Sequence, residues 1–405
     1  MYQSNLNDVL KANTLTCEKK ENIIKTAEQL FHTYGYDEIE TPIFEPYDLY
    51  FAVDGLIMQD DMVKVIGPSG KVLVLRPDVT IPVARLIAKH AKDNRQLERY
   101  FYIMDVFRHA SDRVVAHKQI GVELFGDNSA EVDAEVLALA YDLLSNLQFT
   151  DFTIEVGHAG FVKQILEEIT LTHDELKQLK QFIQAKNKAD LQSFLSKHQV
   201  SKSLQHVILE IPDLYGPADK VIQRARTLSL NNAMNLAIDQ LENIYQLLDL
   251  YGITEKIVLN LGLINQMDYY SDVIFQGFIA NAGEPVLMGG RYDTLTEKFG
   301  VMMPAIGFGC DIHLMMGRLK MNRDVSKREE EIIVDYTPNR IKEAYQLMKL
   351  LRRQSKRVLM NHAPWEIDNN DPVHGIYLKE DQTIVFKEGA KKVFDNIEDV
   401  LAQFQ

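Results

Sequence analysis

The sequence predicts an α+β protein: an antiparallel sheet flanked by helices, with a helical insertion and a small C-terminal α/β domain. Three observations lead to this class. Strand-like apolar or alternating segments, such as 100–108 and 273–279, recur over the first part of the chain, without the regular alternation of βαβ units. Residues 165–226 are rich in Lys, Gln and Leu and contain no strand pattern. A densely charged stretch at 320–331 precedes a short α/β tail.

The first predicted helix covers residues 19–34. Its apolar side chains recur at helical spacing, and Gly35 follows as a stop signal. Residues 36–45 then predict an extended segment, because Pro42 disfavours the helical conformation at Thr41.

The strand expected at 100–108 alternates in part and is rich in aromatic residues. Its expected partner is 121–126, reached across a polar connection at 109–118. The same periodicities predict the other elements of this domain. These are strands at 72–75, 151–156, 257–264, 273–279 and 286–288, helices at 81–90, 133–147, 234–250 and 311–318, and several short helices within the insertion.

The charge pattern divides the chain into two domains. The first spans 1–320 and contains the insertion at about 165–226, the linker spans 321–331, and the second domain spans 332–405. The second is predicted to be α/β, with strands at 332–335, 358–360 and 383–385 and a helix at 340–354.

Charge and composition limit the class of function. Lys and Arg number 44 and Asp and Glu 58, a net charge of −14, whereas nucleic-acid binding depends on basic residues that neutralise phosphates. The two cysteines, Cys17 and Cys310, form no CxxC pattern, which argues against a disulfide scaffold and fits a reducing cytoplasm. Residues 1–16 lack the apolar core of a signal peptide, and no run of about 18 apolar residues predicts a membrane span.

Common catalytic motifs are missing from the sequence. It contains no P-loop and no HExxH zinc motif, and Gly307 and Gly309 alone are weak evidence for a dinucleotide site. The 11 histidines are scattered, and a nearby pair, His109 and His117, lies in a polar stretch where such side chains more often face solvent. We therefore expect no metal and no cofactor.

The informative signal is the order of five separate elements, each weak alone. They are 36–45 ending in Thr-Pro-Ile-Phe-Glu, Leu-Arg-Pro-Asp-Val-Thr at 75–80, Phe-Arg at 107–108 with 119–123, Asp-Tyr-Tyr at 268–270, and Gly-Gly-Arg-Tyr-Asp at 289–293 followed by 305–308. Together they resemble the catalytic domain of histidyl-tRNA synthetase, a class II aminoacyl-tRNA synthetase, over roughly residues 19–320. The resemblance implies an antiparallel sheet that binds an amino acid beside a nucleotide.

The resemblance implies a histidine pocket. The matching positions are Asp78 and Thr80 for the α-amino group, Gln119 and Glu123 facing the substrate, and Tyr269 and Tyr270 along the imidazole. The family residue at the first position is usually Glu. An ammonium group needs carboxylate and hydroxyl acceptors, and an imidazole needs hydrogen bonds and aromatic walls. The alternative is a set of inherited core residues without a ligand, but polar side chains buried without partners would be costly.

The resemblance also implies an incomplete adenylation site. Arg108 stands at the family position that holds the α-phosphate, and Arg113 follows in the shortened loop, so together they form a remnant phosphate site. Leu314 and Asn265 stand where the family has arginines, and Ala110 where it has Glu. Losing one preorganised charge donor costs about 10²–10³ in rate, so losing two arginines predicts a loss of roughly 10⁴.

A synthetase-like domain without these arginines resembles the regulatory subunits of short-form ATP phosphoribosyltransferases, in histidine biosynthesis. The resemblance implies a non-catalytic subunit that the short catalytic subunit requires for activity and that confers feedback inhibition by histidine. The implied partners are that catalytic subunit and histidine, within a cytoplasmic hetero-oligomer, by resemblance a hetero-octamer.

A homodimer inside that assembly would place Pro42 at its interface, although Pro42 can also be an ordinary residue ahead of a strand. The tail is shorter than a synthetase anticodon-binding domain and lacks its recognisable motifs. With the acidic net charge, tRNA binding is not expected.

Two other interpretations stay open. An active histidyl-tRNA synthetase or another adenylate-forming ligase is favoured by Arg108 and Arg291 and opposed by Leu314 and Asn265. Exchange of pyrophosphate with ATP in the presence of histidine would separate this class from a regulatory subunit. The third interpretation is a paralogue that regulates another process by binding an amino acid.

Overall fold

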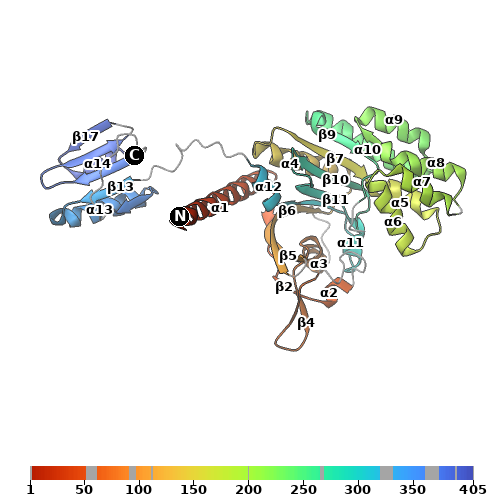
Figure 1. The fold of residues 1–405 in the computed structure, drawn as a ribbon, viewed down its shortest axis with the longest axis horizontal. Coiled ribbons are helices and arrows are strands. Elements are labelled where there is room, and N and C mark those ends of the chain that lie inside the picture. Colours follow the sequence, from red (N-terminus) through yellow and green to blue (C-terminus); the bar gives the residue numbers. More distant parts are fainter. Residues whose placement is uncertain are drawn as a thin grey trace. The chain divides into compact units, whose positions relative to one another are not determined.

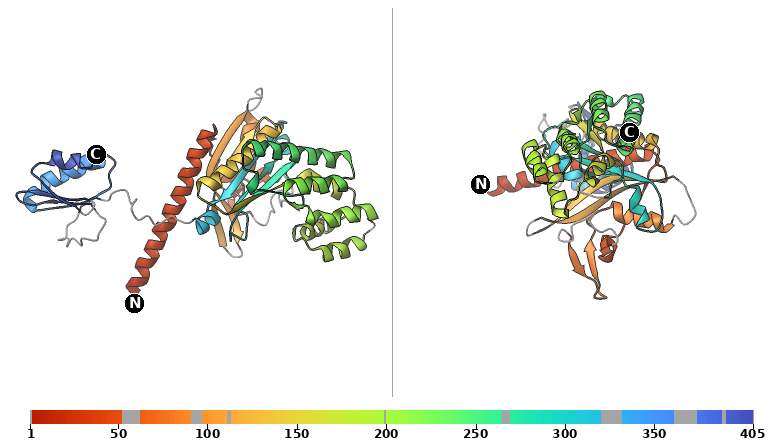
Figure 2. Two further views of the ribbon diagram at one scale, coloured as in Figure 1. Left: turned by 90° about the horizontal axis from the view of Figure 1, so that it is seen from above. Right: turned by 90° about the vertical axis from the view of Figure 1, so that its right-hand side faces the viewer.

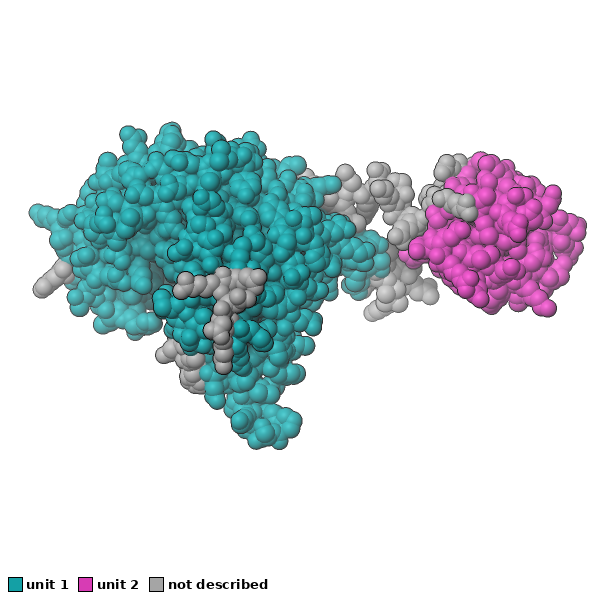
Figure 3. Space-filling model, turned by 180° about the vertical axis from the view of Figure 1, so that it is seen from behind, with its two compact units in different colours: residues 1–319 teal, residues 320–405 magenta. Residues whose placement is uncertain are grey.

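The computed structural model divides the chain into two compact units, Met1–Leu319 and Lys320–Gln405, coloured separately in Figure 3. It describes residues 2–51, 62–90, 97–110, 113–198, 200–264, 269–319, 332–360, 374–387 and 390–404. Each unit has its own hydrophobic core. Within these ranges every helix is too short or too polar to cross a lipid bilayer.

A nine-stranded sheet forms the centre of the first unit (Figure 1). Its strands, in spatial order, are β1 (Asp37–Glu38), β5 (Glu98–Ala110), β6 (Arg113–Phe125), β12 (Ala305–Asp311), β11 (Leu287–Arg291), β10 (Val273–Ile279), β7 (Phe152–His158), β9 (Ile257–Asn260) and β8 (Tyr215–Gly216). Neighbours are antiparallel except for β1 with β5 and β7 with β9. The predicted α+β class is confirmed.

Helices pack against one face of this sheet. They are α1 (Tyr2–Thr33), α4 (Ala130–Asn146), α10 (Asn232–Leu250) and α12 (Ile312–Arg318), and they contact one another and strands of the sheet. Figure 2 shows α1 as one long helix beside the strands. These four helices do not cover the opposite face of the central strands.

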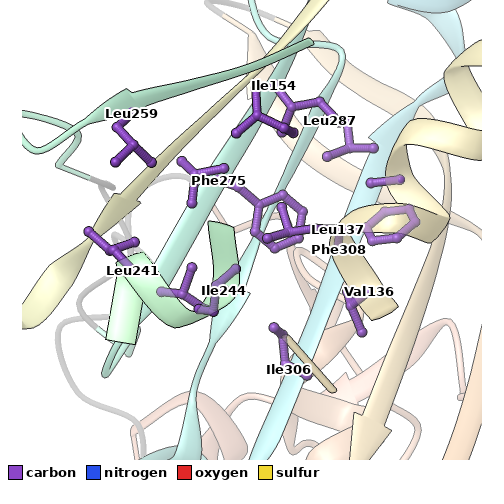
Figure 4. Packing of buried hydrophobic residues seen from close by; sticks show 14 of the residues in the cluster. Val136, Leu137, Ile154, Leu241, Ile244, Leu259, Phe275, Leu287, Ile306 and Phe308 are labelled. Carbon is purple, nitrogen blue, oxygen red and sulfur yellow. The ribbon is translucent and has the colours of Figure 1, made fainter. Parts of the chain in front are cut away.

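Alternation along the strands divides the two faces. Phe275 of β10 and Phe308 of β12 are buried with ring centroids 6.3 Å apart, and Leu137 of α4 belongs to the same cluster (Figure 4). Because successive strand side chains point to opposite faces, Gly307 and Gly309 face away from this core. That glycine-lined face carries the candidate site.

The insertion leaves the sheet at the end of β7 and consists mainly of short helices. These are α5 (Ala159–Glu167), α6 (His173–Gln184), α7 (Lys188–Ser196), α8 (Lys202–Glu210), the 3₁₀ turn η2 (Ile211–Asp213) and α9 (Ala218–Leu228). Their starts are defined by side chains, as at α6, where Thr172 and Glu175 form a capping box. Another 3₁₀ turn, η3 (Thr254–Lys256), precedes β9.

A three-stranded sheet carries the second core of the first unit. Its order is β2 (Phe44–Pro46), β4 (Val72–Leu75) and β3 (Lys64–Ile66), and α2 (Asp48–Phe51), α3 (Thr80–His90) and α11 (Asp293–Glu297) lie in the same region. Arg76 is 3% exposed and donates from Nη1 to the carbonyl oxygens of Thr41, at 2.7 Å, and Pro42, at 3.2 Å. This arginine fixes the segment ahead of β2.

The second unit is a five-stranded sheet with two helices. The strand order is β14 (Val358–Met360), β13 (Ile332–Tyr336), β15 (His374–Leu378), β16 (Thr383–Lys387) and β17 (Ala390–Phe394), with α13 (Ile341–Arg353), α14 (Ile397–Ala402) and the 3₁₀ turn η5 (Pro338–Arg340). Strand β13 is parallel to both neighbours, and the other pairs are antiparallel. Strands β15 and β17 extend the expected set; the linker at 321–331 lies outside the described residues.

Several expected boundaries were wrong. The stretch at 109–118 is not a polar connection, because most of it pairs within the β5–β6 hairpin. Backbone hydrogen bonds hold these rungs, and the apolar and polar residues of 113–118 do not alternate regularly. Helix α1 begins at Tyr2 rather than residue 19, because its first turns are polar and lack a periodic apolar signal. The insertion contains the short strand β8, and β9 ends at Asn260 rather than 264.

Phe275→Ala is expected to lower the free energy of unfolding by about 3–5 kcal/mol, because the fully buried ring would leave a cavity. Urea denaturation followed by circular dichroism measures this loss. Leu236→Ala is the control, since Leu236 is 59% exposed on α10, and its effect should stay within about 0.5 kcal/mol. Equal losses for the two variants would contradict the described core.

Candidate functional site

The expected pocket residues come from three segments of the first unit. Asp78 and Thr80 stand at the start of α3, Gln119 and Glu123 on β6, and Tyr269 and Tyr270 in the segment before β10. The Thr80 hydroxyl donates to Oε1 of Glu123 at 2.7 Å. This hydrogen bond joins the start of α3 to the central sheet.

Glu123 is held from two sides. Its side chain is almost completely buried. The Tyr292 hydroxyl donates to Oε2, whereas Thr80 donates to Oε1. The ring of Tyr269 meets that of Tyr292 edge to face with centroids 5.8 Å apart, and Tyr269 and Tyr270 are 4.7 Å apart. Aromatic side chains therefore cluster beside a buried carboxyl group.

Glycines make room for these groups on the sheet. Gly307 lies opposite Glu123, and a Cβ there would stand 2.1 Å from Glu123 Oε2. A Cβ on Gly121 would stand 2.4 Å from the Tyr102 hydroxyl, and one on Gly290 would stand 2.7 Å from the Tyr270 ring. Larger residues at these positions would displace Glu123, Tyr102 and Tyr270.

Burial determines the protonation of Glu123. Desolvation raises the pKa of Glu123 to about 8, the hydrogen bonds from Tyr292 and Thr80 oppose this rise, and the nearby charge of Asp78 adds to it. The pKa of this carboxyl therefore lies near neutral pH. It can carry or release a proton when a ligand enters.

Asp78 is buried and serves the backbone as well as the pocket. Its Oδ1 accepts a hydrogen bond from the Ile81 amide at 2.8 Å, at the start of α3. Burial raises the pKa of Asp78, while the hydrogen bond from Ile81 and the positive charge of Arg108 lower it. The helix start thus fixes the orientation of this carboxyl group.

Gln119 shares a face with Glu123, because strand side chains alternate. It lies opposite Met104 on β5 and Asp311 on β12 and is half-buried. Its Oε1 lies 3.9 Å from where a Cβ on Gly309 would stand. The amide is therefore at the rim of the glycine-lined surface.

The remnant phosphate positions lie towards the end of the β5–β6 hairpin. Arg108 is exposed on β5, and its charge acts on Asp78. Arg113 is exposed at the first residue of β6, opposite Ala110. The structure thus brings Arg108 within electrostatic reach of the pocket; among the described residues, Arg113 shows no comparable link to it.

Leu314 occupies a position where the resembled family has an arginine. It is half-buried on α12 and packs against the main core, and its backbone amide donates to Asp311 Oδ1 at 3.2 Å. An apolar side chain there supplies no charge for a terminal phosphate. Asn265 lies outside the described residues.

The sequence interpretation missed Tyr292 and Tyr102. Tyr292 lies in the quoted Gly-Gly-Arg-Tyr string, but its hydroxyl reaches Glu123 only in the fold. Tyr102 on β5 lies opposite Gly121 on β6, and its ring occupies space that a side chain at Gly121 would fill. The glycine was therefore the sequence signal for this ring. Among the described residues, no three His, Cys, Asp or Glu side chains converge in a way that could hold a metal ion.

Comparison with known proteins shows the family to which this fold belongs. The family model for histidyl-tRNA synthetase matches residues 6–315. A protein of Oceanobacillus iheyensis named ATP phosphoribosyltransferase regulatory subunit is 41% identical over 384 residues, 95% of this chain and 94% of that protein. This chain belongs to the family of ATP phosphoribosyltransferase regulatory subunits. A relative of the same name from Acetivibrio thermocellus is 35% identical over 84% of this chain and 82% of its own length.

Solved structures support the same family and fold. A Bacillus halodurans structure described as an ATP phosphoribosyltransferase regulatory subunit/histidyl-tRNA synthetase is 29% identical, with a TM-score of 0.78 over 89% of this chain and 94% of its own. A histidyl-tRNA synthetase from a Nostoc species gives a TM-score of 0.77 over 95% of each chain at 18% identity, which shows the shared fold alone. Family membership gives the chain a regulatory, non-catalytic role in histidine biosynthesis.

Glu123→Gln is expected to flatten the fall in stability with rising pH. Because the native pKa of Glu123, about 8, lies above its ordinary value of 4.5, the native state keeps a proton that the unfolded state loses between these values. Stability therefore falls as pH rises through this window. Gln carries no such proton, so its melting temperature should drop less than that of the wild type between about pH 6 and about pH 8.

Differential scanning fluorimetry at constant ionic strength measures this difference. Other buried carboxyls, such as Asp133, contribute equally to both proteins, so the comparison isolates Glu123. Glu297→Gln, at an exposed position, is the control and should keep the wild-type pH profile. Parallel profiles for wild type and Glu123→Gln would contradict the raised pKa.

Proposed function

We propose that histidine binds on the glycine-lined face of the sheet and that its binding inhibits an ATP phosphoribosyltransferase containing this chain. The observation that carries the proposal is the buried Glu123 carboxyl, held by Thr80 and Tyr292 beside the Tyr269–Tyr270 pair. Asp78 and Thr80 supply acceptors for an α-amino group, and Gln119 adds an amide at the rim. The tyrosines and Glu123 suit an imidazole, with its apolar faces and polar edge.

The partner in this proposal is the short catalytic subunit, which requires this chain for activity. Relatives that share most of the chain are named as regulatory subunits of that enzyme, which supports such an assembly. Inhibition then follows from linkage: histidine shifts the assembly towards the state that it binds more tightly, by no more than its difference in affinity for the two states. The proposal places the complex in the cytoplasm, consistent with the free cysteines Cys17 and Cys310.

Adenylation is not part of the proposal. The negative charge on the departing pyrophosphate must be neutralised by cationic side chains. The apolar Leu314 stands at a position where the resembled family supplies an arginine. Arg108 and Arg113 at the hairpin then form at most a remnant phosphate site. The chain's net charge of −14 also weighs against tRNA as a partner.

Reconstitution with the short catalytic subunit of the same organism tests this function. Formation of phosphoribosyl-ATP should require this chain, and histidine should suppress it. Thr80→Val should retain the stimulation but raise the inhibitory histidine concentration about tenfold, because a hydrogen bond to a charged group contributes about 1.5–3 kcal/mol. Thr227→Val, at an exposed position on α9, should behave as wild type.

Lack of stimulation would overturn the regulatory function, and pyrophosphate exchange with ATP and histidine would then test the ligase alternative. Stimulation without histidine inhibition would keep the partnership and remove the proposed ligand. Wild-type inhibition of Thr80→Val would remove the proposed pocket while keeping the inhibitor.

We also propose a homodimer, within a hetero-octamer, that uses the small β2–β4–β3 sheet and the neighbouring Pro42. Ile66 is 82% exposed, and Phe44 and Val72 also expose much of their apolar surface. The buried Arg76 holds Pro42 in place beside this surface. Such exposed apolar surface is typical of association sites.

Ile66→Asp should shift the chain towards its monomer mass of 46.4 kDa in sedimentation or light-scattering measurements, because a charge would enter the buried interface. Leu250→Asp is the control, since Leu250 is 83% exposed at the end of α10, away from this sheet. A dimer that survives Ile66→Asp unchanged would exclude this surface.

A further inference from the structure

The segment that carries Tyr269 and Tyr270 is fixed by the residues that follow it. The Ser271 amide donates to the Arg291 carbonyl oxygen at 2.8 Å, and the Ala159 amide donates to the Asp272 carbonyl oxygen at 2.7 Å. One anchor is the end of β11, and the other is the first residue of α5. The proposed histidine pocket therefore borders the start of the helical insertion.

Arg291 connects the first anchor to the helical layer. Its side chain is 1% exposed, and Nε donates to Oδ1 of Asp133, on α4, at 2.9 Å. Nη1 donates to the Asp127 carbonyl oxygen at 3.0 Å and to Asp293 Oδ1 at 3.2 Å. A buried ion pair of this kind depends on all its hydrogen bonds, since an unpaired buried charge is costly.

Gln240 continues this network from α10. Its Nε2 donates to Oδ2 of Asp133 at 3.4 Å, which orients the amide so that Oε1 faces His158 Nε2 at 3.0 Å. A carbonyl oxygen only accepts, so His158 must carry its proton on Nε2. Burial lowers the pKa of His158, in keeping with a neutral ring.

His158 closes the path at the insertion. It is the N-cap residue of α5 and is 3% exposed, and its Nε2 lies 3.8 Å from the carboxylate of Asp272. Its Nδ1 is buried without a hydrogen-bond partner among the described residues, so Nε2 makes the ring's polar contacts. Helix α10, which supplies Gln240, packs on α4, α5 and α9.

We propose that Gln240 and His158 are positioning residues that couple the amino-acid pocket to the helical insertion. The path runs from the Tyr269–Tyr270 segment through the buried Arg291 and Asp133 and the half-buried Gln240 to the start of α5, and returns through Asp272. Its hydrogen bonds have defined donors and acceptors, so displacing the tyrosine segment breaks particular bonds. This inference rests on the proposed function, in which histidine contacts the Tyr269–Tyr270 segment. Bound histidine strengthens the contact of Asp272 with His158 and Ala159 and so orders the start of α5.

Hydrogen exchange on the wild-type chain, with and without histidine, tests this coupling first. The amides of Ser271 and Ala159 should both become protected when histidine binds, although Ala159 belongs to the insertion. Protection of Ser271 alone would overturn the coupling and leave the histidine pocket intact. Absence of any histidine binding would instead overturn the proposed function, and the coupling with it.

Gln240→Leu removes both hydrogen bonds at similar volume. Its histidine affinity should fall about tenfold, within the range typical of couplings between sites, and Ala159 should lose its histidine-dependent protection. Gln246→Leu is the matched control, because Gln246 is exposed on the same helix. Wild-type affinity and exchange in Gln240→Leu would overturn the assignment.

Rescue by a conservative change separates positioning from general packing. His158→Gln places an amide donor near the former Nε2 position and should keep the coupling, whereas His158→Leu should lose it. Melting temperatures of both variants are compared to confirm folding. If the two variants bind histidine with equal affinity and show equal protection at residue 159, the hydrogen bond is not the coupling element.

Discussion

The hydrogen bonds that Thr80 and Tyr292 donate to the buried carboxyl of Glu123 join three distant segments of the chain. They bring the start of α3 and the end of β11 to one point on β6, where Gly307 leaves room for the carboxyl group. Burial raises the pKa of Glu123 to about 8, so its protonation changes close to neutral pH. The glycine-lined face depends on this junction for the positions of Thr80, Glu123 and Tyr292.

The same sheet serves a synthetase and a regulator because the two tasks use different parts of it. In the proposed function, amino-acid recognition uses acceptors and aromatic walls on β6 and in the segment before β10. Phosphate chemistry needs fixed cations, and Leu314 instead contributes to the hydrophobic core. In the proposed function, a site that binds its amino acid without activating it reports concentration, and the proposed path through Arg291 and Gln240 carries that report to the insertion.

Much of this fold could be predicted from the sequence. The apolar runs predicted β4 and β10 with their observed bounds, although β10 buries most of its side chains and β4 only Val74. Periodicity failed at the end of the β5–β6 hairpin, where apolar and polar residues do not alternate regularly, and in the first turns of α1, where polar residues carry no periodic signal. The order of family motifs led to the expected site residues, which stay a prediction; of these, the structure brings Thr80 and Glu123 into contact. The path from Asp133 to His158 had no local signal, since its members are far apart in sequence and meet only in the fold.

Calorimetric titration of histidine into the isolated chain, without ATP or the catalytic subunit, tests the central claim most directly. The account predicts saturable binding of one histidine per chain, strongly weakened by Thr80→Val, since the pocket is built from this chain's own residues. Binding that appears only with ATP would indicate a surviving adenylation site. Wild-type affinity in Thr80→Val, or no binding at all, would contradict a histidine pocket centred on Glu123.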